Sequence, residues 1–574
     1  MQIQHQSAPT NYSRGKLWAA FLALAVWGGA ATGGWAQDSV AKLTATLRGN
    51  DEAAKMRAID TLARMGSAAK PAIGELAAQL TQSSPAVRAH AAFALGSLGP
   101  LAAESAAALL AAGRDPDPQV RRAAVRALAQ VDPKQAVRAL GASLEDADPA
   151  VRVAALNALT SAGETAVPTL SQALANPATR YWAALALGEL QSLAKPAVGA
   201  LADALKDPDP AVRREVLVAL AKIGPDSALA VPSITQVLSD QDASVRHAAA
   251  FALGHIGPAA ASAAPALANA RQSNDPLMQT VSAWALAHIE PKNEEVRREA
   301  VTLLTARLKD KNPRVQGAAL RGLVELEPDA KTLLPSLSLV VTEGDPGVMQ
   351  DALSVVASLG EAGLPTLIEA LKRPEALSLS TSLIGQLGDK AAAAVPALSA
   401  ALSDPNPEAR REVLLAFAGI GAEASSAQAV VLKALNDPEP RVRHAAAYAV
   451  GRMGERAKGA APQLRAELES SDPVLRVASA WALVHVSARP DQVASVVLPI
   501  LIHGLRNENS AVRRGSAEAL GRLGKAGLGA EAALKSAARD PDESVRKNAL
   551  EALEKMGAVL DAPVPATKRP LREK

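Results

Sequence analysis

Residues 244–257 read Ser-Val-Arg-His-Ala-Ala-Ala-Phe-Ala-Leu-Gly-His-Ile-Gly, and this stretch decides the fold. One set of its apolar residues recurs at the helical spacings i, i+4, i+8 and i+11: Val245, Ala249, Leu253 and Ile256. These spacings predict a helix with one apolar face. Gly257 followed by Pro258 is a usual signal for a helix end. The stretch returns 197 residues later as Arg-Val-Arg-His-Ala-Ala-Ala-Tyr-Ala-Val-Gly-Arg-Met-Gly over residues 441–454.

Arg246 marks a repeat that extends along most of the chain. Sixteen such marks occur, most of them 33 residues apart: positions 55, 88, 121, 152, 180, 213, 246, 279, 316, 349, 377, 410, 443, 476, 513 and 546. The mark is usually Arg, with Leu usually seven residues later and Gly eleven residues later. A period of this length with two helical segments is typical of a solenoid. We therefore predict an all-α fold, a right-handed α-α superhelix of about sixteen helical hairpins.

Each predicted hairpin carries its own start signals. Asp117 can cap a helix whose first position is Pro118, where the missing N–H of proline costs nothing. The same pair of signals recurs at Asp148-Pro149, Asp209-Pro210, Asp275-Pro276, Asn406-Pro407 and Asp472-Pro473. The other helix of each repeat is expected to begin near a proline, as over residues 196–205.

The repeats were themselves duplicated as a block. Residues 152–348 return as 349–545, because the spacings between the marks run through the same series twice. Side chains agree, since Val-Ser-Ala-Trp-Ala-Leu-Ala-His over 281–288 returns as Ala-Ser-Ala-Trp-Ala-Leu-Val-His over 478–485. Six repeats form the duplicated block.

The pattern Asp-Pro-x-x-Val-Arg-x-x-Ala-x-x-Ala-Leu-x-x-x-Gly resembles the HEAT-repeat consensus, in the variant named after the phycobilisome-lyase family. The resemblance covers roughly residues 40 to 557 and implies that the Val-Arg helix lines a concave surface. It also implies a ladder of Asp–Arg pairs between successive repeats. Aspartate stands six residues before the mark in repeats that have their Arg: Asp115, Asp146, Asp207, Asp240, Asp404, Asp437 and Asp540. In the repeat marked by Gln279 this position is Ser273, so we expect the ladder to lose both partners there. We predict that these Asp–Arg pairs stabilise the fold and take no part in catalysis, and that Arg246 belongs to one of them. We call each pair a rung of the ladder.

The composition excludes several classes of function. Basic and acidic residues nearly cancel, 61 against 58, so no global field favours nucleic acid. Cysteine is absent, which excludes disulfides, thiolate metal sites and thiol catalysis. Phosphate loops, metalloprotease helices and nucleophile elbows are also missing. We expect no enzyme activity and no cofactor.

The N-terminal segment has the features of a secretory signal peptide. Arg14 and Lys16 precede an apolar run, and small residues reach Ala36. We predict cleavage after Ala36, with Ala31 as the second choice and an uncleaved anchor over 17–36 as the alternative. The expected parts are a signal peptide at 1–36, the solenoid at 37–557 and a disordered basic tail at 558–574. Export to the periplasm or the extracellular space follows, with no membrane span after cleavage.

The candidate binding residues lie one, five and nine positions after the marks, on a stripe that points away from the predicted core. Five aromatic residues occupy position +5: Phe93, Phe251, Trp284, Tyr448 and Trp481. The duplication presents two matching patches: His247, Phe251, His255, Trp284 and His288, then His444, Tyr448, Arg452, Trp481 and His485. Either these residues bind a ligand, as exposed amphipathic rings do, or they pack between neighbouring helices. A metal site at His255 and His288 is disfavoured, because no carboxylate occupies a matching position.

These observations predict a non-enzymatic exported scaffold that binds protein or peptide along its concave groove. Basic residues at position +1 favour an acidic partner: Arg122, Arg214, Arg411, Arg514 and Lys547. The alternatives are a lyase-like or chaperone-like role in chromophore or cofactor attachment, which the family name suggests, and binding of a polyanion or polysaccharide. Solenoids bind with extended surfaces, which favours the protein partner.

Overall fold

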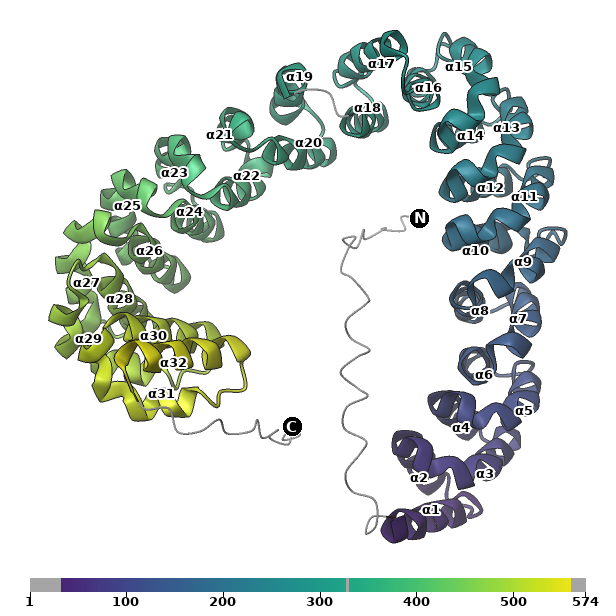
Figure 1. Cartoon of the computed structure of the whole chain (residues 1–574), viewed down its shortest axis with the longest axis horizontal. Helices are drawn as coiled ribbons and strands as arrows, with labels where there is room; N and C mark the ends of the chain where they lie inside the picture. The colour runs from purple at the N-terminus through teal and green to yellow at the C-terminus, as the bar shows by residue number, and fades with distance from the viewer. Residues whose placement is uncertain (1–32, 327–329, 559–574) are drawn as a thin grey trace. The chain divides into compact units, whose positions relative to one another are not determined.

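The computed structural model describes residues 33–326 and 330–558, and the chain divides into two compact units. Unit 1 extends to Arg297 and unit 2 begins at Arg298. Over the described residues all regular structure is helical, either α or 3-10. Each unit consists of stacked helical hairpins, as Figure 1 shows.

Unit 1 has two layers of helices. The first layer contains the marks and has even numbers: α2 (Glu52–Met65), α4 (Pro85–Leu98), α6 (Pro118–Val131), α8 (Pro149–Ser161), α10 (Arg180–Leu190), α12 (Pro210–Ile223), α14 (Ala243–Ile256) and α16 (Pro276–Ile289). The second layer has odd numbers: α1 (Gly33–Leu47), α3 (Ile73–Ala78), α5 (Ala106–Ala112), α7 (Pro133–Ala142), α9 (Val167–Ala173), α11 (Val198–Ala204), α13 (Val231–Val237) and α15 (Ala264–Ala270). We call the even-numbered layer the V-R row; in unit 1 it lies on the concave side (Figure 1).

Unit 2 repeats this arrangement. Its V-R row comprises α18 (Pro313–Glu325), α20 (Pro346–Ser358), α22 (Pro374–Gln386), α24 (Pro407–Ile420), α26 (Pro440–Met453), α28 (Pro473–Val486), α30 (Ser510–Arg522) and α32 (Glu543–Met556). Its other layer comprises α17 (Glu294–Arg307), in which the boundary between the units falls, and then α19 (Ala330–Glu343), α21 (Leu364–Ala370), α23 (Val395–Ala401), α25 (Gln428–Lys433), α27 (Ala461–Ala466), α29 (Ala494–Gly504) and α31 (Glu531–Ala537). All sixteen marks lie in the V-R row, one in each helix.

The start and the buried face of α14 follow the sequence pattern. Asp242 caps the helix, because its Oδ1 accepts hydrogen bonds from the backbone N–H groups of Ser244 at 2.8 Å and Val245 at 3.2 Å. The four residues predicted to form the apolar face are fully buried: Val245, Ala249, Leu253 and Ile256. At α6, Asp117 is the cap and Pro118 the first helical residue, as predicted.

The junction between the two helices of a repeat requires an unusual backbone conformation. Gly257, at the end of α14, has φ of 67° and leads into the 3-10 helix η8 (Gly257–Ala263). Glycine adopts this region without the Cβ clash that other residues suffer. Gln191 follows α10 at the same position of its repeat with φ of 53°, and it is the one non-glycine residue with positive φ in the described chain.

Three helical stretches of the described chain are long and apolar enough, by length and composition alone, to cross a membrane: Pro85–Ala112, Pro210–Val237 and Pro407–Asn436. Each is a V-R helix continued through a 3-10 turn into its partner helix, with a positive-φ glycine at the junction: Gly99, Gly224 and Gly421. Between 44% and 56% of each apolar window is buried inside the structure. Their apolar side chains therefore serve the packing of the array.

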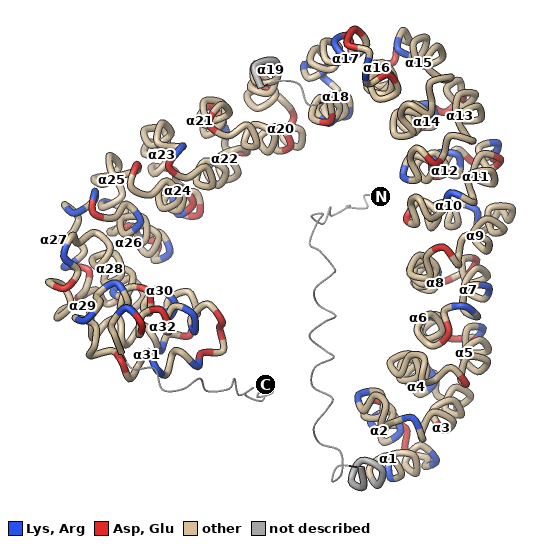
Figure 2. The backbone as a smooth tube through the Cα atoms, viewed as in Figure 1, with Lys and Arg blue, Asp and Glu red and all other residues tan. Residues whose placement is uncertain are grey.

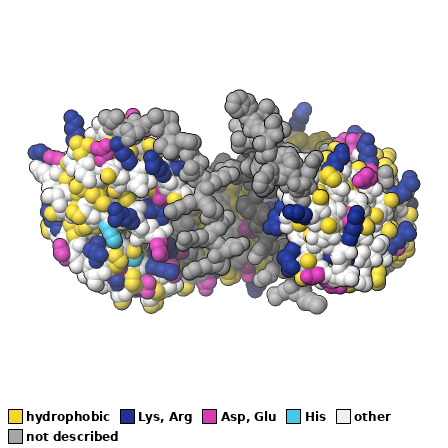
Figure 3. All heavy atoms as spheres, turned by 90° about the horizontal axis from the view of Figure 1, so that it is seen from below, with side chains coloured by type: hydrophobic (Ala, Val, Ile, Leu, Met, Phe, Trp, Pro, Cys, Tyr) yellow, Lys and Arg dark blue, Asp and Glu magenta, His cyan; other side chains and the backbone are white. Residues whose placement is uncertain are grey.

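The predicted all-α solenoid is confirmed. The predicted signal peptide lies almost wholly outside the described residues, which begin at Gly33 with α1, and the predicted tail lies outside them from residue 559. Acidic and basic residues alternate along the helices of both units (Figure 2). On the face drawn in Figure 3, charges of both signs are interspersed with hydrophobic side chains.

Candidate functional site

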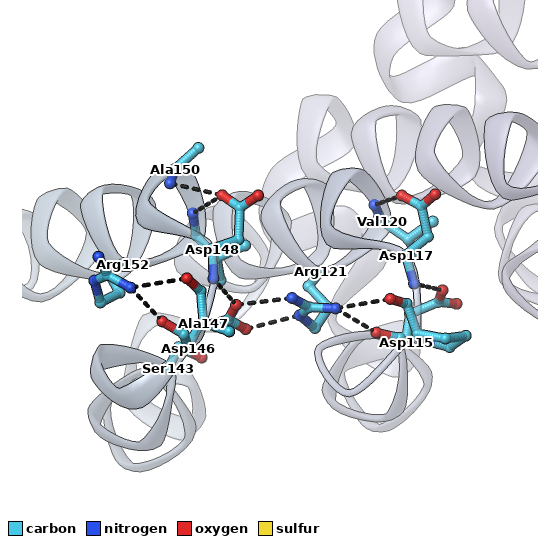
Figure 4. Close-up of polar contacts among 12 residues, drawn as sticks. Asp115, Asp117, Val120, Arg121, Ser143, Asp146, Ala147, Asp148, Ala150 and Arg152 are labelled. Atoms are coloured by element: carbon cyan, nitrogen blue, oxygen red, sulfur yellow. Dashed lines mark hydrogen bonds and ion pairs between the residues drawn. The ribbon is translucent and has the colours of Figure 1, made fainter. Parts of the chain in front are cut away.

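The Asp–Arg ladder joins each repeat to the one after it. Arg121 on α6 donates from Nε to Oδ2 of Asp146 at 2.7 Å and from Nη2 to Oδ1 at 2.8 Å. Its Nη1 donates to the backbone carbonyls of Asp115 and Pro116 in its own repeat, at 2.9 and 3.0 Å (Figure 4). One guanidinium therefore holds its own loop and the acid of the next repeat together.

Where the ladder forms, the Arg of one repeat contacts the Asp that stands six residues before the mark of the following repeat. Six such pairs occur among the described residues: Arg88–Asp115, Arg121–Asp146, Arg180–Asp207, Arg213–Asp240, Arg410–Asp437 and Arg513–Asp540. Asp404 follows a repeat marked by Leu377, so its carboxylate accepts instead from the backbone N–H of Asn406 at 2.8 Å. Lys55 forms the equivalent contact with an uncharged partner, since its Nζ donates to Oε1 of Gln82 at 3.0 Å.

These pairs are ionised and structural. The Arg121 hydrogen bond lowers the pKa of the Asp146 carboxyl below its ordinary value, and burial opposes this only in part. At Asp240, burial is the largest single influence and raises the pKa, but the combined hydrogen bonds and charge of its partners outweigh it, so the pKa is again lowered. Both side chains of each pair are largely buried. A carboxylate held in this way does not serve as a proton donor near neutral pH.

The ladder changes where serine replaces the acid, and the two copies differ in part, because Arg443 Nη2 still donates to Oδ2 of Asp472, the next helix cap, at 3.2 Å. Ser273 and Ser470 stand where Arg246 and Arg443 would find an Asp. Arg246 keeps only its bonds to the carbonyls of Asp240 and Gln241, so the sequence prediction that it forms an acid rung was wrong. In both copies a histidine also contacts the cap of the next V-R helix. His247 Nε2 lies 2.7 Å from Oδ2 of Asp275, and His444 Nε2 lies 2.8 Å from Oδ2 of Asp472, the caps of the next V-R helices.

The first predicted patch is brought together as a layer of rings on α14 and α16, within unit 1. Phe251 stacks on Trp284, with ring centroids 5.5 Å apart and an interplanar angle of 18°. His255 and His288 also flank Trp284, at 5.2 and 4.6 Å between centroids. Phe251 is 40% exposed, whereas Trp284 is only 6% exposed. The imidazole of His247 instead contacts the Asp275 carboxylate.

The second patch forms on α26 and α28, within unit 2. Tyr448 lies 5.2 Å from Trp481, and His485 lies 4.0 Å from it, between ring centroids. Glu518 on α30, which the sequence analysis did not single out, accepts from Trp481 Nε1 at 3.3 Å and lies 3.5 Å from His485 Nε2. The His485 hydrogen bond lowers the pKa of Glu518. Arg452 instead donates to the carbonyl of Ala418 at 3.3 Å.

Both tryptophans are buried between neighbouring helices, which is one of the two arrangements that the sequence allowed for the rings at position +5. A Cβ added to Gly254 would lie 2.2 Å from Cζ3 of Trp284, and a Cβ added to Gly451 would lie 2.2 Å from Cζ3 of Trp481. Each indole therefore packs against a glycine of the preceding V-R helix, in the seam between two repeats. Position +5 points away from the core of its own hairpin but toward the neighbouring helix. Whether the patches bind a ligand remains a prediction.

Within residues 33–326 and 330–558, no group of three or more His, Asp or Glu side chains is placed to hold a metal ion. His255 and His288 both contact Trp284.

The family model described as HEAT repeats matches residues 106–177, 167–231, 231–323, 395–484, 461–533 and 498–572. No curated protein matches the chain. Similar solved structures include the Kap95:Nup1 complex, with 14% identity over 91% of this chain and 84% of that one and a TM-score of 0.48. Yeast importin-beta (Kap95p) shows 13% identity over 90% and 80%, with a TM-score of 0.48. Importin beta in an ammonium sulfate condition shows 15% identity over 91% and 81%, with a TM-score of 0.46.

The predicted location is contradicted by these neighbours. The chain was expected to be exported to the periplasm or the extracellular space, whereas the similar structures are those of importin beta and Kap95. The exported location is therefore withdrawn.

Proposed function

Because the chain belongs to the family of HEAT-repeat proteins, we propose that it is a non-enzymatic scaffold that binds a protein or peptide partner along its V-R row. One observation carries this proposal. Aromatic residues make up only 2% of the chain, yet three of them are exposed at the same position of the V-R row: Phe93 at 63%, Phe251 at 40% and Tyr448 at 41%. Exposed rings on an alanine-rich surface are natural anchors for a partner.

The exposed rings of the two patches are held in place before any partner arrives. Phe251 rests on the buried Trp284, and Tyr448 rests on the buried Trp481. A ring that is already fixed loses little conformational entropy on binding, so more of its contact energy appears as affinity. In this proposal the tryptophans support the site and the exposed rings contact the partner.

The proposal is tested by crosslinking followed by titration. A photo-crosslinking amino acid at position 251 or 448 should capture a protein that the same group at position 229 does not capture. Leu229 is a fair control, because it is 74% exposed but lies in the 3-10 helix η7 (Gly224–Ala230), away from the V-R row. Binding of the identified partner should then weaken at least fivefold in Phe251→Ala or Tyr448→Ala and remain unchanged in Leu229→Ala. Equal capture and equal affinity at all three positions would overturn the proposal.

We prefer a protein partner to a polyanion because some of the basic residues at position +1 are already paired with acidic side chains. Arg411 lies 3.1 Å from Glu408, and Lys547 lies 3.9 Å from Glu551. Polyanion binding needs several free cations in series, since its energy comes from counterion release. The lyase-like alternative would need polar side chains poised for chemistry, whereas the repeated carboxylates are committed to the ladder.

A further inference from the structure

A hollow of about 600 Å³ lies on the V-R row between α2, α4 and α6, in unit 1. Its lining combines an exposed ring, a floor of small residues and two arginines: Phe93, Ala89, Gly96, Ala127, Arg122 and Arg126. Phe93 is the most exposed of the large apolar side chains on the V-R row, at 63%. It lies outside both duplicated patches.

The hollow lies at the same repeat position as the two patches but lacks their indole. Gly96 stands eight residues after its mark, as Gly254 does, and the next V-R helix approaches it closely, since an added Cβ would lie 2.9 Å from Cα of Ala127. At Gly254 the residue at +5 of the next repeat is Trp284, which covers the glycine. At Gly96 that residue is Arg126, which is exposed, and Gly96 itself is buried against Ala127, so no indole covers Phe93 and the open surface of the hollow lies at this ring.

The rim of the hollow is positively charged. Within the described residues the structure records no ion pair for Arg122 or Arg126, although both line the hollow. The acid on the opposite rim, Asp60, is engaged by His90, with Oδ1 and Nδ1 2.8 Å apart. Two guanidinium groups beside the exposed Phe93 ring complement a ligand that carries carboxylates next to a ring.

We propose that this hollow binds an acidic peptide segment of a partner protein, with an aromatic side chain of the segment packed against Phe93. This ring stacks on Phe93 as Trp284 stacks on Phe251, and neighbouring Asp or Glu side chains pair with Arg122 and Arg126. This inference rests on the proposed function, since it names one site on the V-R row and the class of partner that fits it.

A synthetic peptide tests the site on the full chain. The probe is a fluorescently labelled peptide with one Trp flanked on both sides by Asp and Glu, followed by fluorescence anisotropy at low and at physiological salt. We expect saturable binding that weakens with salt. Binding should weaken at least tenfold when Trp is replaced by Ala in the peptide, and at least tenfold again in a peptide with Lys flanks. Equal binding of the Lys-flanked peptide, or none of the acidic one, would overturn the inference.

Variants locate the site and separate binding from folding. Phe93→Ala and Arg126→Gln should each weaken binding about tenfold, whereas Arg514→Gln, on α30, should leave it unchanged. Arg126→Trp places an indole at position +5 of its repeat, the position that Trp284 occupies, beside Phe93. It should abolish binding while the melting temperature stays equal or rises, a result that unfolding cannot produce.

The outcomes distinguish this inference from the proposed function. Peptide binding that is lost in Phe251→Ala but kept in Phe93→Ala would overturn the inference and leave a binding role for the V-R row intact. Binding that is unchanged in every ring variant, and from which a polyanion such as heparin displaces the peptide, would overturn both the inference and the proposed function. Binding that depends on Phe93 and Arg126 but not on Phe251 is the expected result.

Discussion

Nε and Nη2 of Arg213 donate to the two carboxylate oxygens of Asp240 in the following repeat, at 2.8 and 2.7 Å. Both side chains are largely buried, with 14% and 12% of their surface exposed. A solenoid is stabilised through contacts between neighbouring repeats, so this pair couples one hairpin to the next. The consequences can be measured one rung at a time.

Arg213→Ala should destabilise unit 1 by about 2–4 kcal/mol, because it leaves the Asp240 carboxylate buried without its counter-charge. Arg246→Ala is the matched control, since Arg246 has two backbone carbonyls as acceptors but no acid at Ser273. It should cost only about 1 kcal/mol. Urea unfolding of the two variants gives the comparison. Equal losses would show that the carboxylate contact adds nothing to the ladder.

Gln316→Arg should restore a missing rung. In the second copy Arg513 pairs bidentately with Asp540 at 2.8 Å, whereas the equivalent residues of the first copy are Gln316 and Glu343. Gln316 is only 8% exposed, and its Oε1 has no hydrogen-bond partner. An Arg there can reach Glu343, and we expect unit 2 to gain about 1 kcal/mol.

The reciprocal change provides the control for that repair. Arg513→Gln should destabilise unit 2 by about 2–3 kcal/mol, because it leaves Asp540 without its partner. If Gln316→Arg destabilised the protein while Arg513→Gln also did, the two rungs would not be structurally equivalent, despite the duplication.

Gly254→Ala should destabilise unit 1 by about 2–3 kcal/mol, because the new methyl group would lie 2.2 Å from the Trp284 ring and force it out of the seam. Gly199→Ala is the control, since Gly199 lies in α11 with no atom within 4 Å of an added Cβ. That change should stabilise by about 0.5–1 kcal/mol through helix propensity. Thermal unfolding of both variants decides whether Trp284 is a packing element. An unchanged melting temperature for Gly254→Ala would contradict that role.

The fold and the seam differ in how far they could be predicted from sequence. The buried face of α14 and its Asp242 cap depend on residues a few positions apart, and both agree with the pattern. The partner of Arg213 lies 27 positions away in the next repeat, and a linear spacing does not show in which direction the side chain leaves its helix. The burial of Trp284 depends on how closely α16 approaches Gly254, which a helical wheel for a single helix does not contain.

Gln191→Gly should stabilise unit 1 by about 1–2 kcal/mol. Gln191 has φ of 53° and ψ of −132°, a conformation that costs a residue with a Cβ about 1–3 kcal/mol. Glycine has no such cost, and the greater entropy of its unfolded state offsets only part of the gain. The second copy already has glycine at the equivalent position, Gly388, with φ of 64°. Gly388→Gln should therefore destabilise unit 2, and a neutral result for both changes would show that the junction relaxes without strain.

The ladder should also make the protein sensitive to acid. Arg121 lowers the pKa of Asp146, and Arg410 lowers that of Asp437, so each folded-state value lies below the unfolded value of about 3.9. The stability that these groups contribute is therefore complete above about pH 5 and is lost as the pH falls through the unfolded value toward the folded one. In Asp146→Asn this part of the acid dependence is absent. The difference in urea midpoint between the wild type and Asp146→Asn should be constant from about pH 5 to pH 7 and shrink below about pH 4. A difference that persists unchanged at pH 3 would mean that Asp146 stabilises the fold through its uncharged hydrogen bonds and not through its charge.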